Sequence, residues 1–292
     1  MKNRYVLARF AFWLFRFKTL ARVKRIFSSV ESPCLIRRSL FNYKFCLDVS
    51  RSVTHQLLFL EGERFIQERF LLSKLLKPGM RVVDIGANIG YYLLLFEKYI
   101  GSEGEVICIE PSVENLPELK KNIEINRFVN VKLFDVAIGM DDGTTGLRVG
   151  INSGVVEKNQ GAYQVPLRKL DSLVTDKIDF LKIDVEGYEG QVLKGAHEII
   201  IRDTPLLFLE LHPNMLPGYG FSVEQILNDL SKIYRQIDIY ASQSEENIGL
   251  FGKLSVRYFM KDNLIKIDNA EQYIGKFSKQ KMVDSLWAVC QS

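Results

Sequence analysis

Short apolar runs alternate with longer amphipathic segments through most of the chain. Continuous apolar runs predict buried strands, and apolar residues three and four positions apart predict helices that pack on them. Strands are expected at residues 81–85, 105–109, 131–134, 178–184, 206–211, 237–240 and 254–259. This alternation predicts an α/β fold, a doubly wound, mostly parallel, seven-stranded Rossmann-like sheet.

Residues 140–168 interrupt the α/β alternation. Asp141-Asp142-Gly143 predicts a turn, and the segments 144–149 and 162–167 predict a β-hairpin insertion. The remaining segments lie on either side of this core. We expect a basic amphipathic helix in residues 1–30, a short β-hairpin lead-in at 31–62, the main domain at 63–262 and a C-terminal tail at 263–292.

A glycine turn follows the first strand of the main domain. The segment reads Asp84-Ile-Gly86-Ala-Asn88-Ile-Gly90, and the apolar run 91–96 comes directly after it. Glycine lacks a Cβ, so the backbone can bend sharply at Gly86 and a ligand can approach closely at Gly90. A helix that begins there presents free N–H groups and the positive end of its dipole.

The turn matches neither of the common phosphate-binding patterns. A dinucleotide fingerprint needs glycine at its first, third and sixth positions, where this chain has Gly86, Asn88 and Tyr91. A phosphate loop needs Gly-Lys-Ser/Thr, which is absent here. Asp84, just before the turn, would repel a pyrophosphate and attract a cation. S-adenosylmethionine, which carries an ammonium and a sulfonium, is therefore the expected cofactor.

Polar residues recur at the end of each predicted strand. In an open α/β sheet, ligands bind at the carboxyl ends of the strands. Glu110 lies 24 positions after Gly86, close to the spacing of the acid that holds the ribose hydroxyls. The strand-end residues are Asp84, Glu110, Asp135, Asp184, Glu210 and His212.

The charge is unevenly distributed. The first 30 residues hold eight basic residues and no acid, so the net charge of +4 for the whole chain leaves −4 for the remainder. A mildly acidic body argues against a general nucleic-acid binder. The apolar run 10–15 is far too short to span a bilayer. We expect an interfacial helix on an anionic membrane surface of a cytoplasmic protein, with a packing helix or a mitochondrial presequence as alternatives.

The four cysteines, Cys34, Cys46, Cys108 and Cys290, lack the spacing of a metal site. Cys108 lies within a predicted strand and is expected to be a reduced core residue. A disulfide between Cys34 and Cys46 across the lead-in hairpin is the alternative. We favour a reducing compartment.

Several segments in the right order resemble the FkbM family of S-adenosylmethionine-dependent methyltransferases. The block Lys182-Ile-Asp184-Val-Glu186-Gly187 is the most specific of them. The others are Val83–Tyr91, Glu110-Pro-Ser112, Asn122–Asn126, Leu170–Leu173 and Leu209–Pro213. Together they cover about residues 60–215. The resemblance implies methyl transfer, usually to a hydroxyl of a sugar, glycan or secondary metabolite.

An alcohol is a poor nucleophile until a base removes its proton. His212 has a suitable ordinary pKa, and Asp184 is the alternative base. The candidate catalytic residues are His212, Asp184 and Glu210. The candidate cofactor-binding residues are Asp84, Gly86, Asn88, Gly90, Glu110, Ser112, Asp135 and Ala137.

Other functions and an alternative site remain open. We assign no metal, although Asp184, Glu186, Glu210 and His212 are suitable ligands for a hard divalent cation. A methyltransferase acting on nitrogen or on a protein, and a non-catalytic cofactor-binding module, are the alternative functions. The acceptor and the oligomeric state do not follow from the sequence.

Overall fold

The computed structural model describes residues 35–52, 55, 56, 58, 59, 63, 66–148, 154–156, 161–242, 264–268 and 285–292. The expected N-terminal helix and the expected strand at 254–259 lie outside these residues. Within the described part of the chain, no helix has both the length and the apolar character needed to cross a bilayer.

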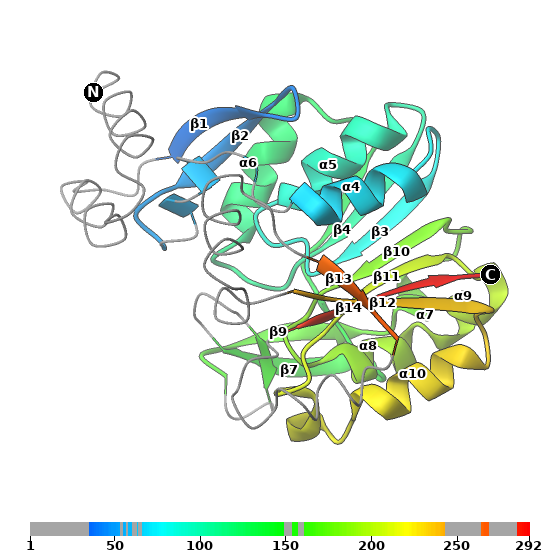
Figure 1. Ribbon diagram of the computed structural model, residues 1–292. Coiled ribbons are helices and arrows are strands. Elements are labelled where there is room, and N and C mark those ends of the chain that lie inside the picture. Colours follow the sequence, from blue (N-terminus) through cyan, green and yellow to red (C-terminus); the bar gives the residue numbers. More distant parts are fainter. Residues whose placement is uncertain are drawn as a thin grey trace, which may run out of the picture.

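A largely parallel sheet runs through the middle of the molecule (Figure 1). Among the described residues it has eight strands, in the order β13-β12-β14-β11-β10-β3-β4-β5. Strand β14 is antiparallel to both of its neighbours. The predicted doubly wound fold is confirmed, with one more strand than the seven expected. The strands are β3 (Arg81–Ile85), β4 (Glu105–Ile109), β5 (Val131–Phe134), β10 (Phe180–Ile183), β11 (Leu206–Leu211), β12 (Gln236–Ser242), β13 (Leu264–Ile267) and β14 (Leu286–Gln291).

The sheet continues beyond residue 262, where the main domain was expected to end. Strand β14 lies between β11 and β12, and five of its residues, 286–290, are buried. Leu286, Ala288 and Cys290 pack on one face of the sheet, whereas Trp287 and Val289 pack on the other. The last segment of the chain is therefore an internal strand rather than a tail.

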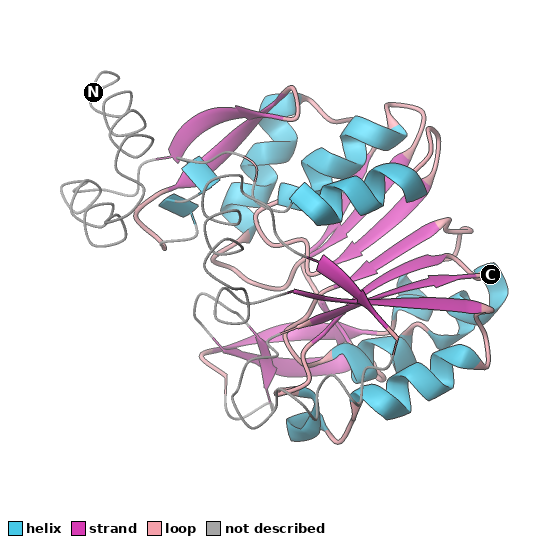
Figure 2. Ribbon diagram, viewed as in Figure 1, coloured by secondary structure: helices cyan, strands magenta, loops and turns pink. Residues whose placement is uncertain are grey.

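Helices cover both faces of the sheet (Figure 2). Helices α4 (Ile66–Leu75), α5 (Tyr91–Ile100) and α6 (Leu116–Asn126) lie above it in this view. Helices α7 (Leu170–Leu173), α8 (Glu189–Gly195), α9 (His197–Asp203) and α10 (Val223–Ser231) lie below, with the 3₁₀ turn η2 (Leu216–Tyr219) near them. Helices α8 and α9 follow β10 and are separated by Ala196.

The predicted hairpin insertion is part of a second, four-stranded sheet. Its strands are β6 (Ala137–Ile138), β7 (Gly143–Arg148), β8 (Gly154–Val156) and β9 (Tyr163–Arg168), and β7 pairs antiparallel with β9. This sheet contacts loops at the carboxyl ends of the central strands. The hydroxyls of Tyr163 and Ser112 are 3.4 Å apart, and the Tyr219 hydroxyl donates to the Val155 carbonyl at 2.5 Å.

The lead-in hairpin, β1 (Leu35–Leu40) and β2 (Tyr43–Asp48), is attached to α6 by a buried amide. The Asn122 Oδ1 atom accepts the Cys46 N–H at 2.6 Å, and its Nδ2 donates to the Ile89 carbonyl at 2.8 Å. Asn122 therefore links this hairpin to the glycine turn. Cys108 and Cys290 are buried free thiols, as expected for Cys108, and Cys46 is buried as well.

Helix α5 contains a buried carboxyl, Glu97, whose side chain predicts a pH dependence of stability. Glu97 is 3% exposed and its Oε1 has no hydrogen-bond partner among the described residues. Burial raises the pKa of Glu97 to about 7. The folded state therefore holds a proton that the unfolded state releases, and stability falls as the pH rises from about 4.5 to about 7.

We expect Glu97→Gln to remove this loss of stability. At pH 8 the variant should exceed the original protein in free energy of unfolding by about 2–3 kcal/mol, with little difference at pH 4. Urea unfolding at both pH values measures the effect, and Glu103→Gln at an exposed position is the control. An unchanged pH slope in Glu97→Gln would show that this carboxyl is not the cause.

Candidate active site

The predicted turn between β3 and α5 brings two strand ends into contact. Gly86 and Gly90 have φ angles of 82° and 89°, in the region that favours glycine. A Cβ at Gly86 would lie 1.9 Å from the Asp184 carbonyl oxygen. Position 86 therefore needs glycine, because any side chain there would collide with the backbone at the end of β10. Helix α5 starts at Tyr91 without a side-chain cap, so its first N–H groups are not taken by a capping side chain.

Asp84 is fully buried and pairs with a buried lysine. The Lys182 ammonium lies 3.0 Å from Oδ1 of Asp84, 3.6 Å from Oδ2 of Asp184 and 4.6 Å from the centre of the Tyr92 ring. Burial lowers the pKa of Lys182, but the charges of Asp84 and Asp184 outweigh it and raise the pKa. The negative charge of Asp84 was expected to attract a cationic ligand, but it interacts mainly with the ammonium of Lys182. The Oδ2 atom of Asp84 is buried without a hydrogen-bond partner among the described residues.

Glu110, at the end of β4, organises the loop around the turn. Its Oε2 accepts the Asn88 N–H at 2.8 Å, and its Oε1 accepts the Ser112 N–H at 2.9 Å and the Asn115 amide at 3.2 Å. Ser112 is fully buried. A carboxylate has about four acceptor positions, so Glu110 can accept further hydrogen bonds from a ligand. The sequence did not indicate the role of Asn115.

The other two candidate cofactor residues lie beyond β5. Asp135 is exposed at the carboxyl end of β5, next to the Glu110 N–H, which donates to the Phe134 carbonyl at 3.1 Å. Ala137 is buried in β6, where it packs in the core of the smaller sheet. Asp135 thus stands at the same sheet edge as Glu110, whereas the side chain of Ala137 is used for packing.

The three candidate catalytic residues gather at the ends of β10 and β11. These strands pair up to Ile183 and Leu209, so Asp184 and Glu210 follow at equivalent positions. Asp184, Glu210 and His212 each offer one donor atom within 4.8 Å of the other two. Asp184 is the most open of them, with 26% of its side chain exposed. The structure thus brings the three candidate catalytic residues together at one edge of the sheet.

The His212 ring lies among carboxylates. Its Nδ1 is 2.7 Å from Oε1 of Glu189, and its Nε2 is 3.5 Å from Oε2 of Glu186 and 3.8 Å from Oε1 of Glu210. Burial lowers the pKa of His212, but the hydrogen bond to Glu189 and the nearby negative charges outweigh it and raise the pKa to about 9. Both ring nitrogens therefore face acids, which is not the environment expected of a histidine acting as a base near pH 7.

Lys182 is part of the most specific motif and Glu189 lies two residues after it, but no role was predicted for either. A lysine within an otherwise apolar strand is itself a signal, because a buried charge needs a partner. Glu189 carried no comparable signal. Its contact with His212 depends on how α8 packs against the end of β11.

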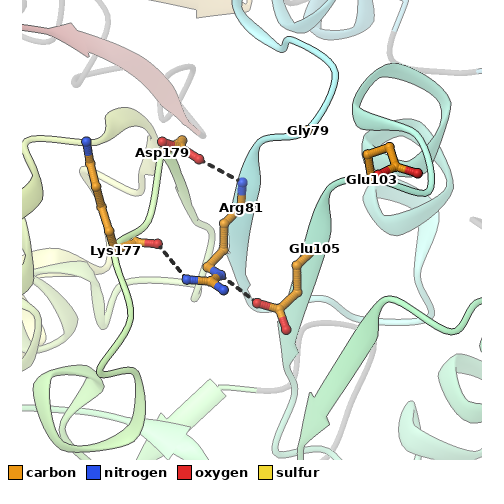
Figure 3. A pocket seen from close by; sticks show the side chains of 6 residues that line it. All are labelled: Gly79, Arg81, Glu103, Glu105, Lys177 and Asp179. Atoms are coloured by element: carbon orange, nitrogen blue, oxygen red, sulfur yellow. Dashed lines mark hydrogen bonds and ion pairs between the residues drawn. The ribbon is translucent and has the colours of Figure 1, made fainter.

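A separate pocket of about 270 Å³ lies at the opposite, amino-terminal edge of the sheet (Figure 3). Arg81 donates to Glu105 at 2.6 Å and to the Lys177 carbonyl at 3.1 Å, and its backbone N–H donates to Asp179 at 2.9 Å. These polar groups bind one another, and none belongs to the strand-end cluster.

Comparisons with known proteins identify the family of this chain. The methyltransferase FkbM domain family matches residues 84–234. Protein-L-isoaspartate O-methyltransferase 1 of Arabidopsis thaliana is 33% identical over 104 residues, which are 35% of this chain and 45% of the relative. Protein-L-isoaspartate O-methyltransferase 2 of the same plant is 31% identical over 108 residues, 35% of this chain and 34% of the relative. The match thus spans less than half of either relative.

Among solved structures, the methyltransferase FkbM of Methylobacillus flagellatus has a TM-score of 0.44 at 16% identity, covering 81% of this chain and 54% of that one. A Streptococcus mutans protein described as a putative methyltransferase, in complex with S-adenosylhomocysteine, has a TM-score of 0.42 at 9% identity. The match covers 79% of this chain and 98% of that one. The family match spans more than half of this chain and includes the glycine turn and all three clustered residues. The chain therefore belongs to the FkbM family of S-adenosylmethionine-dependent methyltransferases.

Proposed function

We propose that this protein is an O-methyltransferase that acts on a hydroxyl of a sugar, a glycan or a secondary metabolite. The main support is the contact between the glycine turn and the end of β10. The Asp184 carbonyl lies against Gly86, so the cofactor turn and the polar cluster share one edge of the sheet. A cofactor on the turn and an acceptor at Asp184 would be neighbours.

The residues around the turn fit S-adenosylmethionine. The uncapped start of α5 and the glycines leave backbone N–H groups and space, and Glu110 has acceptor positions for the ribose hydroxyls. The Oδ2 of Asp84 is buried, has no hydrogen-bond partner in the described part of the chain, and suits an ammonium donor. When bound, this cofactor supplies an electrophilic methyl group on a sulfonium. Proximity of that methyl to the acceptor oxygen is the main catalytic contribution expected.

Asp184 is the group best placed to take the acceptor proton. It is the most open of the three clustered residues and is adjacent to the turn. A carboxylate in hydrogen-bond reach of the hydroxyl can accept its proton as the oxygen attacks. His212 is held by Glu189 and faces Glu210, so we assign it to positioning rather than to proton transfer. This reverses the order of preference drawn from the sequence.

The cofactor assignment is tested at Glu110. We expect the original protein to bind S-adenosylhomocysteine and neither NAD nor ATP. Glu110→Ala should weaken that binding by about 1–3 kcal/mol, because hydrogen bonds to the ribose are lost and the loop held through Asn88 and Ser112 is loosened. Isothermal calorimetry measures both, with Glu114→Ala, an exposed neighbour, as the control. Equal affinities of all three proteins for S-adenosylhomocysteine would show that Glu110 does not bind the cofactor.

We also propose that residues 1–30 bind an anionic membrane surface. This rests on the sequence alone: eight basic residues, no acid and an aromatic run at 10–15. Each basic residue near such a surface contributes about 1 kcal/mol, less at high salt. The full chain should co-sediment with phosphatidylserine vesicles, less so in high salt. A chain beginning at Glu31 should stay in solution with unchanged cofactor affinity. Unfolding of that shorter chain would instead place the segment in the fold.

A further inference from the structure

The polar cluster at the ends of β10 and β11 has the donors of a metal site. Asp184 and Glu210 each contribute a carboxylate oxygen, and His212 contributes a ring nitrogen, all within 4.8 Å of one another. Two carboxylates favour a hard divalent cation, and one imidazole is acceptable to first-row ions such as Mn²⁺. The sheet register fixes the two strand ends, so the three side chains are brought together by the fold itself.

His212 is oriented as metal-binding histidines are. Its Nδ1 lies 2.7 Å from Oε1 of the fully buried Glu189, and the same oxygen accepts the Gly187 N–H at 2.8 Å. A carboxylate behind the ring fixes the tautomer that carries the proton on Nδ1. When a cation takes the place of the Nε2 proton, the lone pair of Nε2 points away from Glu189, toward the side where Glu210 lies at 3.8 Å.

Two carboxylates of the cluster lie near each other at the ends of β10 and β11. Asp184 has 26% of its side chain exposed and Glu210 has 17%, and each has an oxygen within 4.8 Å of the other and of His212. Partly buried carboxylates at this spacing repel each other. A divalent cation between Asp184 and Glu210 would offset that repulsion.

An unpartnered donor beside Glu210 also indicates a ligand. Trp287 pairs with Glu210 across β11 and β14, so the two side chains leave the same face of the sheet. The indole N–H of Trp287 is buried and has no hydrogen-bond partner among the described residues. An oxygen ligand held at the cluster, such as water or an acceptor hydroxyl, would suit this donor.

We propose that Asp184, Glu210 and His212 bind a divalent cation of the Mg²⁺ or Mn²⁺ class, with Glu189 as the residue that orients His212. Three protein ligands leave positions of an octahedral ion open to oxygen atoms of the acceptor. The ion lowers the pKa of a coordinated hydroxyl, and the proton passes to the second oxygen of Asp184. This chemical role rests on the proposed methyl transfer, whereas the binding of the cation does not.

Manganese binding to the full chain tests the site without any acceptor. After treatment with a chelator and its removal, electron paramagnetic resonance should show one Mn²⁺ bound per chain. Glu210→Gln and His212→Gln should each weaken binding at least tenfold, and Glu189→Gln about 10–100-fold. Each variant should keep its calorimetric affinity for S-adenosylhomocysteine, which shows that it is folded. Glu103→Gln, at the opposite edge of the sheet, should bind Mn²⁺ normally.

The outcomes separate this inference from the proposed function. Stoichiometric Mn²⁺ binding that depends on His212 and Glu189 supports the site, even if no hydroxyl acceptor is methylated. Absent binding, or binding that is equal in all variants, overturns it. Full methyl transfer in excess chelator would likewise contradict a role for the cation while leaving the transferase assignment intact.

Discussion

Asp184→Asn is expected to lower methyl transfer by about 10²–10⁴-fold, the range typical of a lost general base. Asparagine has nearly the same shape but cannot accept the acceptor proton. The main-chain carbonyl that contacts Gly86 is retained, so the cofactor turn should keep its form. Single-turnover rates with labelled cofactor measure the loss. The affinity for S-adenosylhomocysteine should be unchanged.

His212→Ala is the comparison for this experiment. If His212 positions the cluster, its loss should reduce turnover less than Asp184→Asn does. Near-normal turnover in Asp184→Asn together with an inactive His212→Ala would reverse the two roles. The sequence alone favoured that reversed assignment.

Lys182→Met is expected to lower the free energy of unfolding by about 3–5 kcal/mol, the cost of leaving one partner of a buried ion pair unpaired. Asp84 is fully buried, and Lys182 is the cation within 3.0 Å of it. The double variant Lys182→Met with Asp84→Asn should regain part of the loss, because no buried charge is then left alone. Urea unfolding measures all three proteins.

Lys232→Met provides the matched control for Lys182→Met. Lys232 pairs with Asp229 at 2.6 Å, but both side chains are more than 60% exposed. An exposed pair of this kind contributes about 0–1 kcal/mol. Similar losses in the two lysine variants would show that the buried pair near the turn has no special stabilising role.

The sheet was largely predictable because buried parallel strands are continuous apolar runs. Strands β3, β4, β5, β10 and β11 all lie where such runs occur. Residues 286–290 form an equally apolar run, but the segment before them has a mixed polar and apolar character. The sequence therefore did not indicate that this strand lies between β11 and β12. Period and composition indicate that a strand exists, and they do not indicate which strands become its neighbours.

The site was predictable in its location and less so in its contacts. Parallel strands end at one edge, so Asp184, Glu210 and His212 were expected to meet. The partners that determine the behaviour of these groups come from elsewhere in the chain. Lys182 is 98 positions from Asp84, and Glu189 is 23 positions from His212. The pairing of Asp84 and the acidic surroundings of His212 therefore emerged only with the packing of the sheet and α8.

The most direct test of the proposed function is transfer of a tritiated methyl group from S-adenosylmethionine to a pool of hydroxylated glycans and small alcohols. We predict label in a base-stable methyl ether, with transfer greatly reduced in Asp184→Asn. Label in a base-labile protein ester, or on nitrogen, would contradict the hydroxyl assignment. Cofactor binding with no transfer to any acceptor would contradict catalysis.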